Sequence, residues 1–229
     1  MRKLLLILSL AVALCSVAQT AAKKDAAKPE PYKYGVYYYQ KTSLFDELPV
    51  DSTDIVMLGN SLTDGCEWHE LFGMPNLKNR GINSDVIQGI YDRLPSLIAG
   101  QPAKIFLMAG TNDVSHNLSA DSIAEAYGKL IDHIRATMPN TKLYVQSGLP
   151  INISFGAYKG MKGKDQVIRD VNAKVSQMAQ EKGFTWIDLY PYFADEEGHL
   201  HKEFTNDGIH LLATGYLKGK ECIEPYIRE

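Results

Sequence analysis

Short, continuous apolar runs alternate with amphipathic stretches along most of this chain, and this alternation most constrains its fold. The apolar runs predict five strands, at residues 54–58, 77–81, 104–109, 142–147 and 185–189. The stretches between and after them predict four helices, at residues 84–99, 120–138, 165–182 and 211–227. Strands that are apolar throughout are typical of a sheet covered on both faces, and strand–helix alternation implies parallel strands. We therefore expect an α/β fold with a five-stranded parallel sheet.

The first eighteen residues have the pattern of a secretory signal peptide. Two basic residues precede an apolar run at residues 4–14 that is too short to cross a bilayer, and residues 16–18 have the small-x-small cleavage pattern. We expect export to the periplasm or the exterior, with cleavage near Ala18. Cys15 offers an alternative as a lipoprotein acylation site, which Leu14 disfavours because a small residue is expected before such a cysteine.

After the signal peptide, the composition predicts one linker and one domain. Residues 19–31 are rich in Ala, Lys and Pro and are expected to form a disordered linker. Residues 32–229 then have the length of a single ordinary domain. Residues 32–49 are rich in tyrosine and are expected to wrap that domain as a short helix or an extended arm.

The charge balance limits the kinds of partner. Loss of residues 1–18 lowers Lys plus Arg from 24 to 22 against 27 Asp plus Glu, for a net charge of −5. No basic block interrupts this acidic balance, so nucleic acid and an anionic membrane surface are not expected as partners. No other segment is long and apolar enough to cross a membrane, so stable membrane insertion after cleavage is not expected either. The sequence does not indicate an oligomeric state. Cys66 and Cys222 are the two cysteines after cleavage, and their spacing permits either a disulfide or two free thiols.

Two short segments carry the residue types of a nucleophilic catalytic set. Ser61 follows a predicted strand in Gly59-Asn60-Ser61-Leu62-Thr63, and Asp207-Gly208-Ile209-His210 precedes the last predicted helix. A serine hydroxyl needs a base to accept its proton, and imidazole titrates near neutrality. Asp207, three residues before His210, can accept the other ring N–H and orient the base. This set predicts acyl transfer to water.

The negative charge that develops on an attacked carbonyl oxygen also needs hydrogen-bond donors. Three candidates lie at or near predicted strand ends, where ligands bind in open parallel sheets. They are the backbone N–H of Ser61, the backbone N–H of Gly81 in Asn79-Arg80-Gly81-Ile82-Asn83, and the side-chain amide of Asn112 in Gly110-Thr111-Asn112-Asp113. Together they would form an oxyanion hole.

These segments resemble blocks I, II, III and V of the SGNH hydrolase (GDSL-like esterase/lipase) superfamily, in the right order. The resemblance rests on Gly59-Asn60-Ser61-Leu62, Gly81 after Asn79-Arg80, Gly110-Thr111-Asn112-Asp113 and Asp207-Gly208-Ile209-His210, and it covers nearly all of residues 32–229. Asn60 stands where the family name has Asp, as in the platelet-activating-factor-acetylhydrolase-like and sialate O-acetylesterase-like branches.

The resemblance implies a flavodoxin-like three-layer α/β/α sandwich and a serine esterase that needs no cofactor. It implies Ser61 as nucleophile, Asp207 and His210 as the rest of the triad, and Ser61, Gly81 and Asn112 as oxyanion donors. The expected substrate is a short acyl ester, O-acetyl on a carbohydrate such as sialic acid or a plant or host glycan. A lysophospholipase or thioesterase, or a glycan-binding module without catalysis, are the alternatives.

Other residues are candidates for secondary roles. Asn60, Arg80, Asn83 and Trp68 are candidate substrate-binding residues, and Trp68 alternatively packs with Phe72 inside the domain. Asp113 and Asp188 are alternative partners of His210, less favoured than Asp207. His199, His201 and Glu203 could be metal ligands, and residues 159–164 are expected to form a mobile, solvated rim. No metal site is predicted, because the histidine pair lacks a third ligand at helical spacing.

Overall fold

The computed structural model describes residues 33–229, and Tyr34–Glu229 form one compact unit. The predicted signal peptide and linker, and the alternative at Cys15, fall outside the described residues. No helix among residues 33–229 combines the length and the apolarity needed to cross a bilayer.

Five parallel strands form the centre of this unit. They are β1 (Ile55–Gly59), β2 (Leu77–Gly81), β3 (Lys104–Met108), β4 (Lys142–Gln146) and β5 (Thr185–Ile187), hydrogen-bonded in the order β2-β1-β3-β4-β5. The predicted parallel sheet is confirmed. From β1 the chain adds β2 on one side of the sheet and then β3, β4 and β5 on the other, so a topological switch point lies between β1 and β3. Ligands bind beside the carboxyl ends of the strands at such a point.

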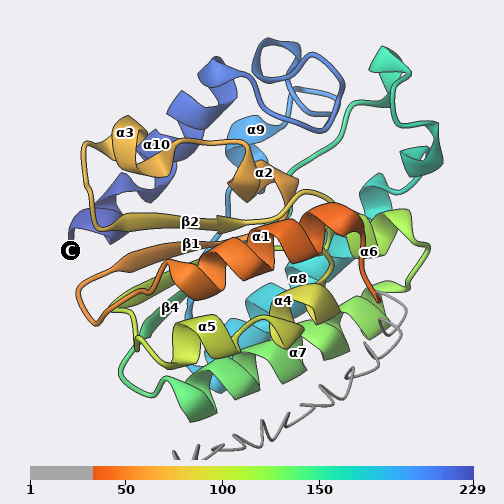
Figure 1. Ribbon diagram of the computed structural model, residues 1–229. Helices are drawn as coiled ribbons and strands as arrows, with labels where there is room; N and C mark the ends of the chain where they lie inside the picture. Colours follow the sequence, from red (N-terminus) through yellow and green to blue (C-terminus); the bar gives the residue numbers. More distant parts are fainter. Residues whose placement is uncertain (1–32) are drawn as a thin grey trace, which may run out of the picture. The chain divides into compact units, whose positions relative to one another are not determined.

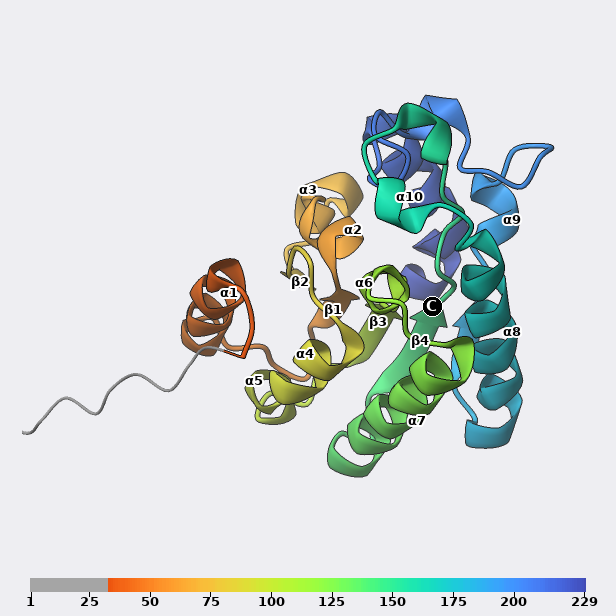
Figure 2. The same cartoon turned by 90° about the vertical axis from the view of Figure 1, so that its right-hand side faces the viewer.

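Helices cover both faces of the sheet (Figures 1 and 2). In chain order they are α1 (Val36–Glu47), α2 (Ser61–Asp64), α3 (Trp68–Phe72), α4 (Ile87–Asp92), α5 (Pro95–Ile98), α6 (Thr111–Ser115), α7 (Ala120–Thr137), α8 (Asp165–Lys182), α9 (Tyr190–Phe193) and α10 (Ala213–Arg228). Three single turns of 3₁₀ helix, at Ile153–Phe155, Lys159–Met161 and Lys202–Phe204, lie in the loops.

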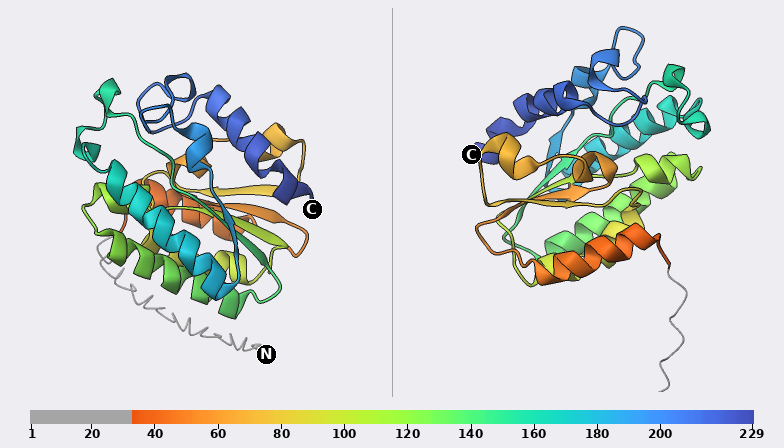
Figure 3. Two further views of the ribbon diagram at one scale, coloured as in Figure 1. Left: turned by 180° about the vertical axis from the view of Figure 1, so that it is seen from behind. Right: turned by 45° about the horizontal axis from the view of Figure 1, so that its top comes forward.

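The two faces of the sheet each carry a hydrophobic core. Val56 and Leu58 of β1 pack on one face with α4, α5, α7 and α8, whereas Ile55 and Met57 pack on the other with α2, α3, α9 and α10. This division follows from the alternation of side chains along a strand. The two helical layers lie on opposite sides of the sheet (Figure 3). The unit is thus a three-layer α/β/α sandwich, as predicted.

The predicted helix at residues 84–99 is wrong in its extent. The chain forms two shorter helices instead, α4 and α5. Ser84 has φ of +63°, which no right-handed helix contains, and Pro95 takes the first position of α5 because it lacks an N–H for a continuous helix. This early break leaves residues 82–86 as a loop at the carboxyl end of β2.

The ends of six other elements differ from the predictions by one or two residues, namely β1, β3, β4, β5, α7 and α10. β4 and β5 end before residues 147 and 189, because the hydroxyl of Ser147 accepts the backbone N–H groups of Leu189 and Tyr190, each at 2.9 Å. The last helix begins at Ala213 rather than at residue 211, since Leu211 pairs with Thr205 in an isolated β-bridge.

The tyrosine-rich segment is a helix, one of the two predicted forms. In α1, the buried ring of Tyr38 donates its hydroxyl to the carbonyl of Gly89 at 2.8 Å, and Phe45 packs in the same small core. This helix therefore anchors against α4. Cys66 is buried and Cys222 half-buried, and both are free thiols.

Candidate active site

Ser61 lies at the turn from β1 into α2, as the first residue of the helix. The side chain of Asn60 caps this helix, since its Oδ1 accepts the N–H of Leu62 at 3.1 Å. A side chain at Gly59 would come within 2.3 Å of the carbonyl oxygen of Met108, so only glycine fits between β1 and β3. The backbone N–H of Ser61 has no acceptor among residues 33–229.

The structure brings Ser61, His210 and Asp207 together across 149 positions of sequence. The Nε2 of His210 lies 3.0 Å from the Oγ of Ser61. The Nδ1 of the same ring lies 2.7 Å from the Oδ2 of Asp207. With Nδ1 protonated toward Asp207, Nε2 is the nitrogen that can accept the serine proton.

Asp207 is held in place by the turn that follows it. Its Oδ1 accepts the N–H groups of Ile209 and His210, each at 2.8 Å. Burial raises the pKa of the Asp207 carboxyl, but these two amides and the His210 ring outweigh that effect and hold the pKa below its ordinary value. The carboxylate therefore stays ionised and can orient the imidazole.

Gly208 allows this turn to lie against the loop after β4. It has φ of +92°, and an added Cβ would lie 2.0 Å from the carbonyl oxygen of Asn152. The N–H of Asn152 donates to the carbonyl of Gly208 at 2.8 Å. The short Asp207–His210 segment is thus fixed from both sides.

Asn112 lies in α6, directly after β3 and across the switch point from Ser61. The turn before it is held by Tyr127, whose buried hydroxyl bonds both the N–H and the carbonyl of Ala109 at 3.0 and 2.9 Å. The Nδ2 of Asn112 donates to the carbonyl of Asp85 at 2.8 Å. A side-chain amide has two N–H donors, so one remains for a ligand.

The predicted role of Gly81 as an oxyanion donor is not supported by the geometry. Its single N–H donates to the Oδ1 of Asn79 at 2.7 Å. Its missing side chain serves packing, because a Cβ there would lie 2.1 Å from the backbone nitrogen of Asp64 in α2. Gly81 is therefore a packing glycine whose donor is already used.

The loop that follows β2 has free backbone N–H donors that the sequence patterns did not predict. Among the described residues, the backbone N–H groups of Asn83 and Ser84 have no acceptor. Ser84 has φ of +63°, a conformation that costs a side-chain-bearing residue about 1–3 kcal/mol and that occurs often at functional sites. A glycine would have signalled this turn, whereas a serine does not.

Two of the four candidate substrate-binding residues are buried and used by the fold. Asn60 caps α2. Arg80 donates to the carbonyls of Asn79 and Leu48 at 2.8 and 2.6 Å, and its guanidinium lies over the ring of Phe45. The predictions that Asn60 and Arg80 bind substrate are therefore wrong. Asn83 is exposed on the loop after β2, and its role stays a prediction.

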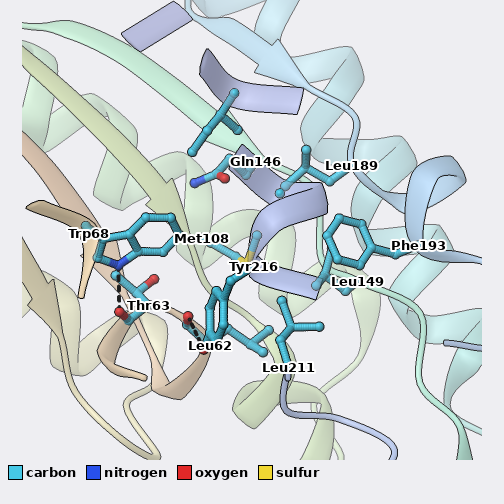
Figure 4. A pocket seen from close by; sticks show the side chains of 12 residues that line it. Leu62, Thr63, Trp68, Met108, Gln146, Leu149, Leu189, Phe193, Leu211 and Tyr216 are labelled. Carbon is cyan, nitrogen blue, oxygen red and sulfur yellow. Dashed lines mark hydrogen bonds between the residues drawn. The ribbon is translucent and has the colours of Figure 1, made fainter. Parts of the chain in front are cut away.

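Trp68 is also turned inward, toward the core. Its Nε1–H donates to the carbonyl of Thr63 at 2.8 Å, and its ring packs against Phe72 and edge-on against Tyr216. It lines a cavity of about 20 Å³ between the sheet and α10, with Gln146 and Phe193 on the other side (Figure 4). The packing alternative for Trp68 is therefore the observed one.

The weaker candidates lie elsewhere. Asp113 is buried and accepts the N–H of Ile87, and the exposed Asp188 accepts the N–H of Tyr190, so neither contacts His210. Among residues 33–229, no three His, Cys, Asp or Glu side chains are grouped to hold a metal ion. The segment at residues 159–164 is not only a solvated rim, since the ammonium of Lys164 donates to the carbonyls of Val114 and Ser115.

Tyr158 is a site residue that sequence reasoning missed. Its hydroxyl lies 3.3 Å from the Nδ1 of His210, and the two rings pack edge-on with centroids 5.6 Å apart. The ring is 41% exposed, so it presents an aromatic surface beside the triad. Residue 158 lies in an irregular loop 52 positions from His210, and no local pattern connects the two.

An open cavity of about 820 Å³ lies near this loop. It is lined by Asn152, Ser154, Asp195, Glu196, Glu197, His199 and His201, among others. Asn152 connects it to the triad, since the same residue bonds Gly208. Carboxylate and imidazole groups of this kind can bind hydroxyl groups.

Comparisons with known proteins show what this chain is similar to. The sequence profile of the GDSL-like lipase/acylhydrolase family matches residues 57–218. An N-acylneuraminate cytidylyltransferase from Escherichia coli O18:K1:H7 (strain RS218 / NMEC) is 26% identical over 181 residues, which cover 77% of this chain and 40% of that protein. The chain thus spans well under half the length of this curated relative.

Several solved structures share the fold. A GDSL-like lipase from Bacteroides thetaiotaomicron VPI-5482 has a TM-score of 0.72 and 24% identity, covering 83% of this chain and 96% of that one. A Streptococcus pneumonia protein provisionally described as a platelet activating factor has a TM-score of 0.77 and 23% identity, covering 83% and 92%. An acetyl-xylooligosaccharide esterase from Geobacillus Stearmophilus has a TM-score of 0.63 and 15% identity, covering 79% of this chain and 96% of that one.

Proposed function

Because this chain belongs to the GDSL-like lipase/acylhydrolase family and is an acylhydrolase, we propose that it hydrolyses short acyl esters through an acyl-enzyme on Ser61. The observation that carries the proposal is the pair of contacts made by His210, 3.0 Å from the Ser61 hydroxyl and 2.7 Å from the Asp207 carboxylate. That arrangement activates a hydroxyl as a nucleophile without a metal or an organic cofactor.

The reaction proceeds in two halves. Ser61 Oγ attacks the ester carbonyl carbon while His210 Nε2 takes its proton, and the imidazolium then protonates the departing alcohol oxygen as the C–O bond breaks. In the second half, His210 takes a proton from water, the resulting hydroxide attacks the acyl carbon, and the proton returns to Ser61 as the acid leaves. Asp207 stabilises the imidazolium in both halves.

The developing oxyanion is stabilised by three donors around the switch point. We assign them to the free backbone N–H of Ser61, the second N–H of the Asn112 side chain, and a backbone N–H of the Asn83–Ser84 turn. The last replaces Gly81, whose N–H is already donated to Asn79. The hydrogen bond from Asn112 to the Asp85 carbonyl holds this loop beside α6. Removal of one such donor typically lowers turnover by about 10²–10³-fold.

A carbohydrate O-acetyl ester is the substrate class that fits best. The exposed ring of Tyr158 beside His210 can stack on a sugar ring, and the nearby cavity offers carboxylates and imidazoles to sugar hydroxyls as well as apolar surface to the ring carbons. Two of the comparisons point the same way in their names, one to acetylated xylooligosaccharides and one to N-acylneuraminate. The acidic lining favours a neutral sugar over an anionic one.

The proposal is tested by Ser61→Ala. This variant should retain its thermal unfolding transition and lose hydrolysis of p-nitrophenyl acetate by more than about 10³-fold, because the nucleophile is absent. A fluorophosphonate probe should label the wild type and not the variant. Ser43→Ala, which changes an exposed serine of α1, is the matched control and should keep both activity and labelling. Full turnover by Ser61→Ala would remove Ser61 from the mechanism.

The substrate class is tested separately. Nitrophenyl esters of increasing acyl length should be cleaved best at acetyl, and acetylated xylooligosaccharides should be cleaved faster than O-acetylated sialic acid, acyl glycerols or lysolipids. A preference for long acyl chains or lysolipids would replace the carbohydrate assignment by a lysophospholipase or thioesterase and leave the Ser61 mechanism intact.

A further inference from the structure

A buried arginine lies beneath the proposed catalytic loops and is not part of the triad. The side chain of Arg93 is 5% exposed, and that of its partner Asp85 is fully buried. The guanidinium uses three nitrogens: Nε donates to the Oδ2 of Asp85 at 2.8 Å, one Nη to the carbonyl of Arg80 at 2.9 Å, and the other to the carbonyl of Gly59 at 3.0 Å.

These acceptors belong to the segments that carry the proposed catalytic groups. Gly59 ends β1, two residues before Ser61, and its carbonyl also accepts the N–H of Ile82 at 3.1 Å. Arg80 is the second-last residue of β2, three positions before the first of the two free N–H groups. The carbonyl of Asp85 accepts the side chain of Asn112 at 2.8 Å. One guanidinium therefore connects the carboxyl ends of β1 and β2 and, through Asp85, the loop after β3.

Stability alone is a weak explanation for this pair. Burial raises the pKa of the Asp85 carboxyl and the charge of Arg93 acts against that rise, so the fold accepts a desolvation cost to keep the pair. Buried ion pairs often stabilise less than apolar residues of the same volume. A guanidinium is, however, a rigid planar fork with fixed donor directions, which a lysine ammonium cannot reproduce.

We propose that Arg93 and Asp85 are positioning residues for the hydrolytic reaction. They hold the nucleophile turn, the Asn83–Ser84 turn and Asn112 at fixed separations, so that the oxyanion donors are in place before the substrate binds. Displacement of reacting groups by about 1 Å can lower turnover by about 10²-fold. The inference rests on the proposed function, because it concerns the same site.

The chain contains a matched control in Arg80. Arg80 is buried to the same degree as Arg93, and both guanidinium groups lie near the ring of Phe45, at 4.8 and 5.9 Å. Arg80 also donates to two backbone carbonyls, but these belong to Asn79 and Leu48. Replacing either arginine removes a buried fork, and only Arg93 reaches Gly59 and Asp85.

The experiment compares Arg93→Lys with Arg80→Lys on p-nitrophenyl acetate, with thermal unfolding measured for both. We expect both variants to melt at lower temperature. At a temperature where both are folded, Arg93→Lys should lower kcat by about 10- to 100-fold with KM changed less than about 3-fold. Arg80→Lys should keep kcat within about 3-fold. Equal kcat values for the two variants, or losses that follow the melting temperature, would overturn the assignment.

Asp85→Asn provides the second test, and decides the matter if Arg93→Lys does not fold. It keeps the side-chain volume and an oxygen acceptor but removes the charge that orients Arg93, so kcat should fall and KM should remain near the wild-type value. An unchanged kcat in Asp85→Asn would contradict the proposal. A wild-type protein that neither cleaves esters nor reacts with the fluorophosphonate would instead refute the proposed function itself.

Discussion

At the scale of single residues, Tyr158 lies beside His210, where its side chain can contact the alcohol part of a bound ester. Its hydroxyl is a neighbour of the Nδ1 of His210 rather than its main partner, because Asp207 lies closer, at 2.7 against 3.3 Å. The half-exposed ring is free to contact a bound molecule. We therefore expect Tyr158 to act on the alcohol part of the substrate and not on the triad.

Tyr158→Ala should lower kcat/KM for acetylated xylooligosaccharide by about 3- to 10-fold, the range that corresponds to an aromatic stacking contact of about 0.5–1.5 kcal/mol. Hydrolysis of ethyl acetate should change little, because an ethyl group is too small to reach the ring. Tyr158→Phe keeps the ring and should behave like the wild type on both esters. Equal losses on both esters in Tyr158→Ala would show that the residue supports the triad instead.

At the scale of elements, α6 joins the proposed site to α4 through a buried carboxyl. Asp113, next to Asn112, accepts the N–H of Ile87 at the start of α4 at 3.2 Å. Burial raises the pKa of Asp113 to about 6. A carboxyl with a raised folded-state pKa stabilises the fold only while it is protonated, so this contribution is complete below pH 4 and is lost as the pH rises through 6.

Asp113→Asn should remove this pH dependence, because an amide keeps an oxygen for Ile87 and has no proton to lose. Relative to the variant, the wild type should lose up to about 3 kcal/mol of unfolding free energy between pH 4 and pH 7. Urea unfolding of both proteins at several pH values measures this difference. A difference that stays constant with pH would show that Asp113 does not titrate in this range.

At the scale of the whole unit, one lysine joins the sheet to the last helix. Lys104 begins β3, and its buried ammonium donates to the carbonyls of Tyr226, Ile227 and Glu229 at 2.8 to 3.0 Å. These carbonyls end α10, where helix acceptors lack intrahelical partners and a cation is favourable. The contact lies at the amino end of β3, opposite to the edge that carries Ser61 and Asn112.

Lys104→Met should therefore lower the free energy of unfolding by about 1.5–3 kcal/mol, the range for hydrogen bonds to a charged group, while kcat per folded molecule stays unchanged. Lys142→Met is the matched control: Lys142 begins β4 and contacts Glu229 at 3.4 Å, but it is 61% exposed and should contribute less than about 1 kcal/mol. Chemical denaturation measures both. Equal costs for the two substitutions would argue against the buried cap.

The sequence alone determined which segments are strands and which polar residues follow them, and both matter to the site. The predicted bounds of β2 and α8 agree with the structure, and in α8 the buried residues Ile168, Val171, Val175 and Ala179 recur with the period of a helix. Ser61, Asn112, Asp207 and His210 could be identified from their residue types in short motifs, which lie near predicted strand ends or before the last predicted helix.

Only the tertiary structure decided which groups around them are free to bind a substrate. The Asn79 side chain occupies the N–H of Gly81, so the free backbone donors of this region are those of Asn83 and Ser84. Arg80 turns inward to the carbonyl of Leu48, 32 positions away, and Trp68 to the carbonyl of Thr63. Tyr158 reaches His210 from 52 positions away. Whether a polar group is satisfied depends on partners brought near by folding, and local periodicity contains no information about them.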